Sequence, residues 1–190
     1  INLLGEHTDY NDGYVLPAAI DLALFVVVGK AGQQSCWIAL DKAEKVQVRL
    51  DKLERVEVHW SNFIKGVVRE LQKRGVLVPE FNAVFGGNIP EGAGLSSSAA
   101  LETGFLVALN KLFDLQLSPL DIIVLAQKAE NNFVGVNCGI MDMFANMMGR
   151  EGQLLQLDCR SLEVAYLPFD NPRYSLILCN SKVKHSLVDS

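Results

Sequence analysis

The chain has 190 residues, 49% of them hydrophobic and 21% charged, which is enough for one sizeable buried core. The net charge of -5 at pH 7 excludes the broad basic surface typical of proteins that bind nucleic acid or anionic membranes. The longest apolar runs, such as 22–28, are too short to cross a bilayer, and the chain opens without a secretory signal pattern. Four widely spaced cysteines form no metal-ligand pattern, which is typical of a reduced, cytoplasmic protein. The charge and the short apolar runs predict no nucleic-acid or membrane partner.

Hydrophobic periodicity and turn residues predict a chain of mixed α and β structure. Alternating or β-branched apolar segments predict strands over residues 21–30, 35–40, 46–50, 81–85, 153–158, 162–166 and 175–180. Helical periodicity predicts helices over residues 61–74, 99–112, from 118 onward, and 140–148. Ser61 and Ser118 stand at two of the predicted helix starts, where a serine side chain can cap a free backbone N–H group.

A glycine- and serine-rich loop lies between a predicted strand and a predicted helix. It reads Pro-Glu-Gly-Ala-Gly-Leu-Ser-Ser-Ser-Ala-Ala over residues 90–100. Gly92 and Gly94 permit a tight turn and a close ligand approach, and free backbone N–H groups at the helix start favour an anion. The loop is neither a Walker loop nor a dinucleotide fingerprint, because it lacks Gly-Lys-Ser/Thr and Ser97 replaces the third glycine. A capped helix after a flexible loop is the alternative.

This loop resembles the second motif of the GHMP kinases, a superfamily that includes galactokinase, homoserine kinase and mevalonate kinase. The resemblance implies a loop that binds ATP through Gly92, Ala93, Gly94, Leu95, Ser96, Ser97 and Ser98. It also implies that Ser98 and Glu130 hold Mg²⁺, and that Trp60 lines the adenine pocket. The alternatives are an ordinary polar position for Glu130 and a core tryptophan for Trp60.

The opening segment, Asn-Leu-Leu-Gly-Glu-His-Thr-Asp-Tyr-Asn-Asp-Gly over residues 2–13, is rich in groups that bind hydroxyls. Carboxylates and an imidazole form charge-assisted hydrogen bonds with sugar hydroxyls, and one turn can bring Glu6, His7 and Asp9 together. A polar, acidic surface turn is the alternative. The segment resembles the galactokinase signature, and that resemblance implies that these three residues contact a sugar.

Asp142 stands alone among apolar neighbours, which fits either an exposed helix position or a functional acid. The segment Cys-Gly-Ile-Met-Asp over residues 138–142 resembles the family segment that carries the proposed catalytic Asp. That resemblance implies that Asp142 activates a sugar hydroxyl and that Gly139 offers its backbone to the sugar, although Met143 stands where the family usually has Gln. Lys184 lies in a segment that resembles the one supplying a basic catalytic residue, often Arg.

The resemblance implies an α+β fold: a GHMP kinase N-terminal domain, similar to ribosomal protein S5 domain 2, over residues 1–170. Residues 171–190 would begin a C-terminal portion that is otherwise missing. The implied reaction is ATP-dependent phosphorylation of galactose at its C1 hydroxyl, giving galactose 1-phosphate, with Mg²⁺ and a monomer at full length. The alternatives are a non-catalytic fragment, a galactose-sensing homologue, or a kinase for a related sugar such as N-acetylgalactosamine.

Overall fold

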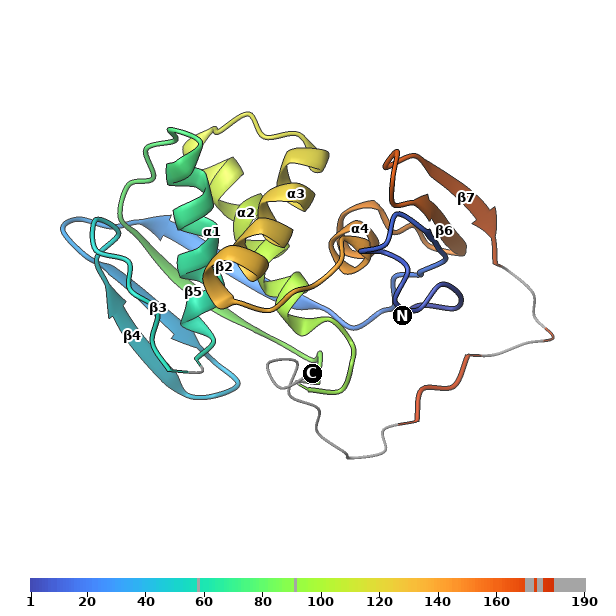
Figure 1. The fold of residues 1–190 in the computed structure, drawn as a ribbon. Coiled ribbons are helices and arrows are strands. Elements are labelled where there is room, and N and C mark those ends of the chain that lie inside the picture. Colours follow the sequence, from blue (N-terminus) through green and yellow to red (C-terminus); the bar gives the residue numbers. More distant parts are fainter. Residues whose placement is uncertain (58, 91, 170–172, 174–175, 180–190) are drawn as a thin grey trace.

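A four-stranded mixed sheet forms one layer of the structure, a computed structural model that describes residues 1–57, 59–90, 92–169, 173 and 176–179 (Figure 1). The strands are β2 (Leu24–Lys30), β3 (Ser35–Ala39), β4 (Glu44–Val48) and β5 (Phe81–Gly87). Their order in the sheet is β2-β5-β3-β4, and β5 pairs antiparallel with β2 but parallel with β3. A helical crossover must therefore connect the β3–β4 hairpin to β5, because parallel neighbours cannot be joined by a tight turn.

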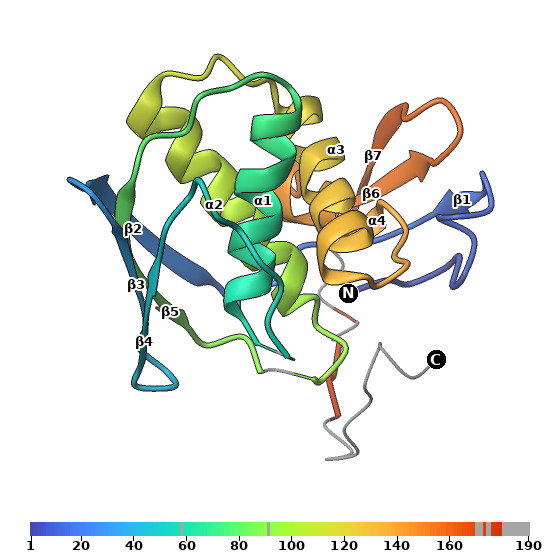
Figure 2. The same ribbon diagram turned by 60° about the vertical axis from the view of Figure 1, so that its left-hand side comes forward.

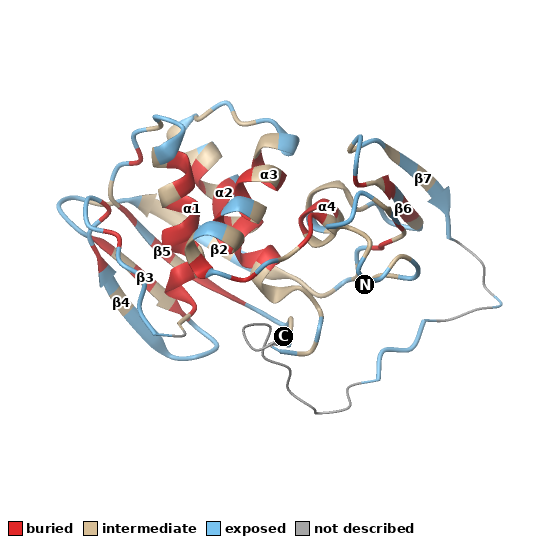
Figure 3. Ribbon diagram, viewed as in Figure 1, coloured by how far each residue is buried: buried red, intermediate tan, exposed pale blue. Residues whose placement is uncertain are grey.

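Two helices cover one face of this sheet, and a third packs against them on the side away from the sheet (Figure 2). They are α1 (Ser61–Lys73), α2 (Ser97–Phe113) and α3 (Pro119–Ala129). Their inward faces and the sheet share a core in which the largest side chains are fully buried, and red segments mark these faces in Figure 3. Trp37 stacks on Phe81 with ring centroids 5.4 Å apart, and Phe81 in turn contacts Phe105 of α2. Each such side chain contributes about 1.5–3 kcal/mol through burial alone.

A smaller unit packs beside the helices and carries the N-terminal loop (Figures 1 and 2). It consists of α4 (Met141–Met148) and a three-stranded antiparallel sheet of β1 (Tyr14–Val15), β6 (Gln153–Asp158) and β7 (Val164–Pro168). Met143 and Phe144 of α4 and Leu157 of β6 belong to the same buried cluster as the main core. Continuity of the core fixes the N-terminal loop and α4 relative to the start of α2.

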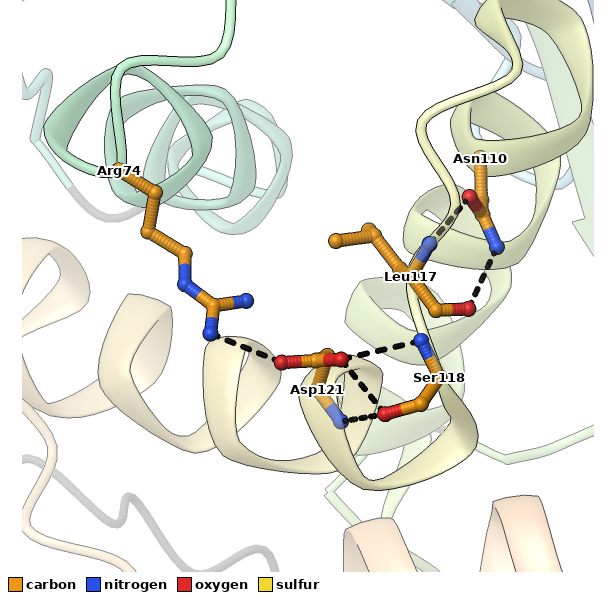
Figure 4. Close-up of polar contacts among 5 residues, drawn as sticks. All are labelled: Arg74, Asn110, Leu117, Ser118 and Asp121. Carbon is orange, nitrogen blue, oxygen red and sulfur yellow. Dashed lines mark hydrogen bonds and ion pairs between the residues drawn. The ribbon is translucent and has the colours of Figure 1, made fainter.

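The start of α3 shows how local sequence sets an element boundary (Figure 4). The Ser118 hydroxyl accepts a hydrogen bond from the Asp121 N–H at 3.1 Å, and the Asp121 carboxylate accepts one from the Ser118 N–H at 3.0 Å. Arg74 of the α1 C-cap donates to Asp121 at 2.8 Å, and these partners lower the pKa of Asp121 to about 2. Asn110 bonds both backbone groups of Leu117, so the turn between α2 and α3 is held at both ends.

Several elements differ from the sequence prediction. The prediction that Ser61 caps α1 is wrong, because Ser61 is the first helical residue and its hydroxyl bonds the His59 ring at 2.8 Å. The two-residue strand β1 was not predicted, and neither was the π-helical turn η1 (Glu130–Val134) that continues α3. Residues 176–179 carry no strand, while the rest of that predicted strand and the 170/171 domain boundary lie outside the described residues. No helix in the described part of the chain could span a membrane.

Candidate active site

The serine-rich loop enters α2 through a sequence of left-handed backbone conformations. Gly92 and Gly94 have φ angles of +66° and +69°, and a Cβ added at either glycine would meet open space. Glycine is therefore required by the backbone rather than by crowding, and a ligand can approach both positions closely. Ser96, the N-cap of α2, has φ of +57° and makes no side-chain cap hydrogen bond with the described residues. The start of α2 thus keeps its N–H groups for an anion.

Two cavities flank this loop and divide its serines between them. Ser97 and Ser98 line a cavity of about 700 Å³ together with Trp60 and residues of the sheet. Ser96 lines a second, mostly apolar cavity of about 860 Å³ together with Asp142. The loop is therefore the wall between a site beside the tryptophan and a site beside the acid.

Trp60 serves both the core and the first cavity, so the two interpretations of this residue are compatible. Its side chain is only 7% exposed, and its ring meets Phe85 edge-on at 5.1 Å. The indole N–H donates to Glu44 at 2.6 Å, and the His59 ring bonds the same carboxylate oxygen at 3.1 Å. The bond from Trp60 is the main cause that lowers the pKa of Glu44. Glu44 and His59 therefore fix the orientation of the indole in the cavity wall.

Glu130 lies buried at the start of η1 and interacts with the Ser98 hydroxyl. Burial raises the pKa of Glu130, and the contacts with Ser98 and the Cys138 thiol oppose that rise. The Cys138 thiol donates to Glu130 at 3.4 Å, and burial strongly raises the thiol pKa, so the thiol stays a donor. A hydroxyl beside a carboxylate is an oxygen-only pair that suits a hard cation such as Mg²⁺. No group of three or more His, Cys, Asp or Glu among the described residues could hold a metal by itself.

Asp142 lies in the first turn of α4, half-buried, and contacts Ser96 across the second cavity. Burial is the main cause that raises its pKa, the contact with Ser96 lowers it, and Asp9 and Glu6 raise it further. Asp142 lines the second cavity together with Ser96 and Ile1, so it lies toward the loop and the N-terminal segment.

Asp9 packs directly against Gly139. A Cβ built on Gly139 would lie 1.7 Å from Oδ2 of Asp9, so only glycine leaves room for this carboxylate. Glu6 and His7 are exposed: Glu6 accepts a hydrogen bond from Asn2 at 2.9 Å, while the His7 ring bonds the Tyr10 hydroxyl at 2.5 Å. Glu6 and Asp9 thus lie near enough to Asp142 to raise its pKa, and Asp9 lies against Gly139. The His7 ring bonds Tyr10 instead.

Two residues of this region were not predicted from the sequence, and one prediction lies outside the described residues. Glu44 comes from β4, far from Trp60 in sequence, so no local pattern reveals their contact. Glu102 lies four residues after Ser98 on α2, so both residues lie on one face of the helix. This spacing is the sequence signal by which Glu102 could have been predicted to lie near the site. Lys184, which was predicted as a basic catalytic residue near Asp142, lies outside the described residues.

Two family models match the chain. Residues 62–150 match the model of the GHMP kinases N terminal domain, and residues 1–30 match the galactokinase galactose-binding signature. The galactokinases of Thermococcus kodakarensis and Thermosipho africanus are 44% and 40% identical over 190 residues, which is 100% of this chain and 53% of each relative. The chain therefore spans about half the length of the curated relatives it matches.

Solved structures agree with the sequence matches. A Lactococcus lactis galactokinase complexed with galactose matches with a TM-score of 0.84 and 34% identity, covering 95% of this chain and 50% of that one. A mevalonate kinase from Methanococcus jannaschii matches with a TM-score of 0.71 at 16% identity, which shows a shared fold. The chain belongs to the GHMP kinase superfamily, in which it corresponds to the N-terminal portion of the galactokinases.

Proposed function

We propose that this chain is the substrate-binding portion of an enzyme that transfers the γ-phosphoryl group of ATP to the C1 hydroxyl of galactose. The observation that carries the proposal is the position of Asp142, which contacts Ser96 of the phosphate-type loop and is influenced by Asp9 and Glu6 of the sugar-type segment. One acid between an anion cradle and a hydroxyl-binding segment is the arrangement that phosphoryl transfer to a sugar requires.

The nucleotide would occupy the cavity between Trp60 and the loop. The indole face and Phe85 offer an apolar, aromatic surface for a purine, and Ser97 and Ser98 line the same cavity. The remaining loop residues, Gly92, Ala93, Gly94, Leu95 and Ser96, would supply backbone N–H groups and room for the phosphates. The family match and the residues that line this cavity support ATP as the co-substrate.

The sugar would bind on the N-terminal side of Asp142. Asp9 and Glu6 present carboxylate oxygens that accept hydrogen bonds from hydroxyl groups, and His7 lies in the same turn. Gly139 brings a backbone segment against Asp9, where its peptide groups can meet a further hydroxyl. The specific galactose assignment is supported by the signature match over residues 1–30 and by the name of the related structure.

Ser98 and Glu130 would hold Mg²⁺, since they are an adjacent hydroxyl and carboxylate at the helix start. When bound, Mg²⁺ neutralises charge on the transferring phosphates. Asp142 orients the sugar hydroxyl and accepts its proton as the oxygen attacks the γ-phosphorus, while the N–H groups at the start of α2 stabilise the charge on the transferred group. Lys184 remains a predicted cationic partner of Asp142. Monomeric state and cytoplasmic location also remain predictions, supported by family and composition.

The experiment is a coupled assay of ADP release with and without galactose, on the 190-residue chain and on the gene product that contains it. We expect Asp142→Ala to lower galactose-dependent turnover by about 100- to 10,000-fold while galactose and ATP binding, measured by calorimetry, change little. Asn146→Ala is the matched control, since Asn146 lies one turn along α4 and its side-chain amide donates to the backbone carbonyl of Asp142 at 3.1 Å. Ordinary turnover by the Asp142 variant would refute the assignment of the base.

A further inference from the structure

Two amide side chains that the proposed mechanism does not use hold the loop between η1 and α4. Asn131 of η1 accepts a hydrogen bond from the Cys138 N–H at 2.9 Å and donates to the Cys138 carbonyl at 3.4 Å. Gln127 of α3 donates to the same carbonyl at 3.3 Å. Gln127 and Asn131 are four residues apart, so they lie on one face and meet Cys138 together.

A primary amide suits this pair of contacts at position 131. Its oxygen accepts from the Cys138 N–H while its NH₂ group donates to the Cys138 carbonyl, whereas a carboxylate could only accept. The Cys138 N–H also bonds the Val136 carbonyl at 3.0 Å, so the turn before Cys138 is closed on itself. Asn131 therefore fixes both backbone groups of one loop residue to the end of the helix.

The residue after Cys138 is Gly139, which is buried and forms a wall for the Asp9 carboxylate. A Cβ at position 139 would lie 1.7 Å from Oδ2 and 2.6 Å from Oδ1 of Asp9, so the backbone itself lies close behind both oxygens. A movement of the loop thus changes the space in which this carboxylate rests. Asp142 is less dependent on the loop, because Met143 and Phe144 anchor α4 in the core.

Neighbouring residues of η1 point to different parts of the site. Glu130 interacts with Ser98 on the side of the predicted metal ligands, and Asn131 bonds Cys138 on the side of the sugar-type segment. Asn132 donates to Glu70 of α1 at 3.2 Å, away from both. A π-helical turn is often found at functional sites, and here it distributes consecutive side chains among three partners.

We propose that Asn131 is a positioning residue for the sugar site. Its amide holds Cys138, which fixes Gly139 as the wall that keeps the Asp9 carboxylate directed at a sugar hydroxyl. This inference rests on the proposed function, because it assumes that Asp9 binds galactose. Binding groups need supporting residues that lock their positions, and Asn131 supplies this support through the backbone rather than by touching the sugar.

The test measures galactose and ATP affinity by calorimetry on the gene product that contains this chain. Asn131→Ala removes both bonds from this side chain to Cys138. Gln127→Ala removes only the bond of 3.3 Å, and it tests the same loop if Asn131→Ala does not fold. The matched control is Asn132→Ala, the neighbouring amide of η1, whose partner is Glu70.

We expect Asn131→Ala to weaken galactose binding by about 5- to 10-fold and Gln127→Ala by about two-fold, because each loosens the loop behind Asp9. ATP affinity should stay within about two-fold in both variants, and Asn132→Ala should leave both affinities unchanged. Unchanged galactose affinity in Asn131→Ala, or equal losses of galactose and ATP affinity, would overturn the proposal. If only Gln127→Ala folds, unchanged galactose affinity in that variant overturns it equally.

Two further measurements separate a positioning role from a general loss of structure. In the Asp9→Ala background no carboxylate remains to be held, so Asn131→Ala should add little to the loss of galactose affinity. In the coupled assay Asn131→Ala should raise KM for galactose and leave kcat within about two-fold, since the core anchors the helix of Asp142. Additive losses, or a kcat that falls as far as the affinity, contradict the proposal.

Failure of this inference differs from failure of the proposed function. Unsubstituted protein that binds no galactose contradicts the proposed function and this inference with it. Galactose binding that Asn131→Ala leaves intact contradicts this inference alone.

Discussion

The contact between Gly139 and Asp9 gives the sharpest prediction about the sugar site. In Gly139→Ala the new methyl carbon would lie 1.7 Å from Oδ2 and 2.0 Å from Cγ of Asp9, so the carboxylate must leave its position. A hydrogen bond to a charged group contributes about 1.5–3 kcal/mol, which corresponds to about 10- to 150-fold in affinity. We therefore expect Gly139→Ala to weaken galactose binding by about that factor while ATP binding changes little, because Asp9 lines neither cavity beside the loop.

Isothermal calorimetry with galactose and with ATP tests this expectation, and a double-mutant cycle makes it specific. Asp9→Ala should weaken galactose binding as much as Gly139→Ala does. In the Asp9→Ala background the methyl group at position 139 meets no carboxylate, so the second substitution should add little. Gly29→Ala is the control, since a Cβ there meets nothing within 4 Å. Additive losses in the double variant, or an unchanged galactose affinity in Gly139→Ala, would refute the reasoning.

Three further predictions concern acid chemistry and the fold. Because the pKa of Asp142 is raised, its basic form is lost as pH falls through that raised value, so turnover should decline at a higher pH than an unperturbed Asp would allow. The same raised pKa stabilises the fold only at low pH, and this contribution is lost as pH rises through it, so Asp142→Asn should raise the unfolding midpoint at neutral pH. Ser118→Ala removes the cap of α3 and should lower the free energy of unfolding by about 1 kcal/mol in urea titrations, with kinetics unchanged. A turnover that declines only at the pH of an ordinary Asp would contradict the first prediction. An unchanged unfolding midpoint in Asp142→Asn would contradict the second, and an unchanged urea midpoint in Ser118→Ala the third.

Local signals predicted the elements whose boundaries depend on neighbouring residues. The start of α3 followed from Ser118, Pro119 and Asp121, and the structure shows the predicted cap there. The failure at Ser61 has a physical cause: the backbone N–H of Ser61, the first of the helix, donates to the His59 ring at 3.1 Å, so a side chain of the preceding turn satisfies it. A side-chain partner two residues away thus shifted the helix start by one residue.

Features that depend on distant residues could not be predicted in this way. The strand order β2-β5-β3-β4 places sequence-distant strands side by side, and no local pattern encodes it. β1 contains two residues, too few for any periodicity, and exists because Val15 pairs with Leu157 of β6. The family resemblance supplied the candidate site residues, while the contact between Asp9 and Gly139 required coordinates because 130 positions separate them.

The three acids around the start of α2 share one property that bears on function. Burial is the main cause that raises the pKa of Glu102, Glu130 and Asp142, so each would stabilise the fold better if it were replaced by an apolar side chain of similar size. Acids gathered where ionisation is unfavourable are explained by selection for chemistry rather than for stability. The acids lie beside different serines: Glu130 interacts with Ser98, and Asp142 lines the second cavity together with Ser96. In the proposed reaction these positions have separate tasks: Glu130 would hold a cation beside Ser98, and Asp142 would accept the sugar proton beside Ser96.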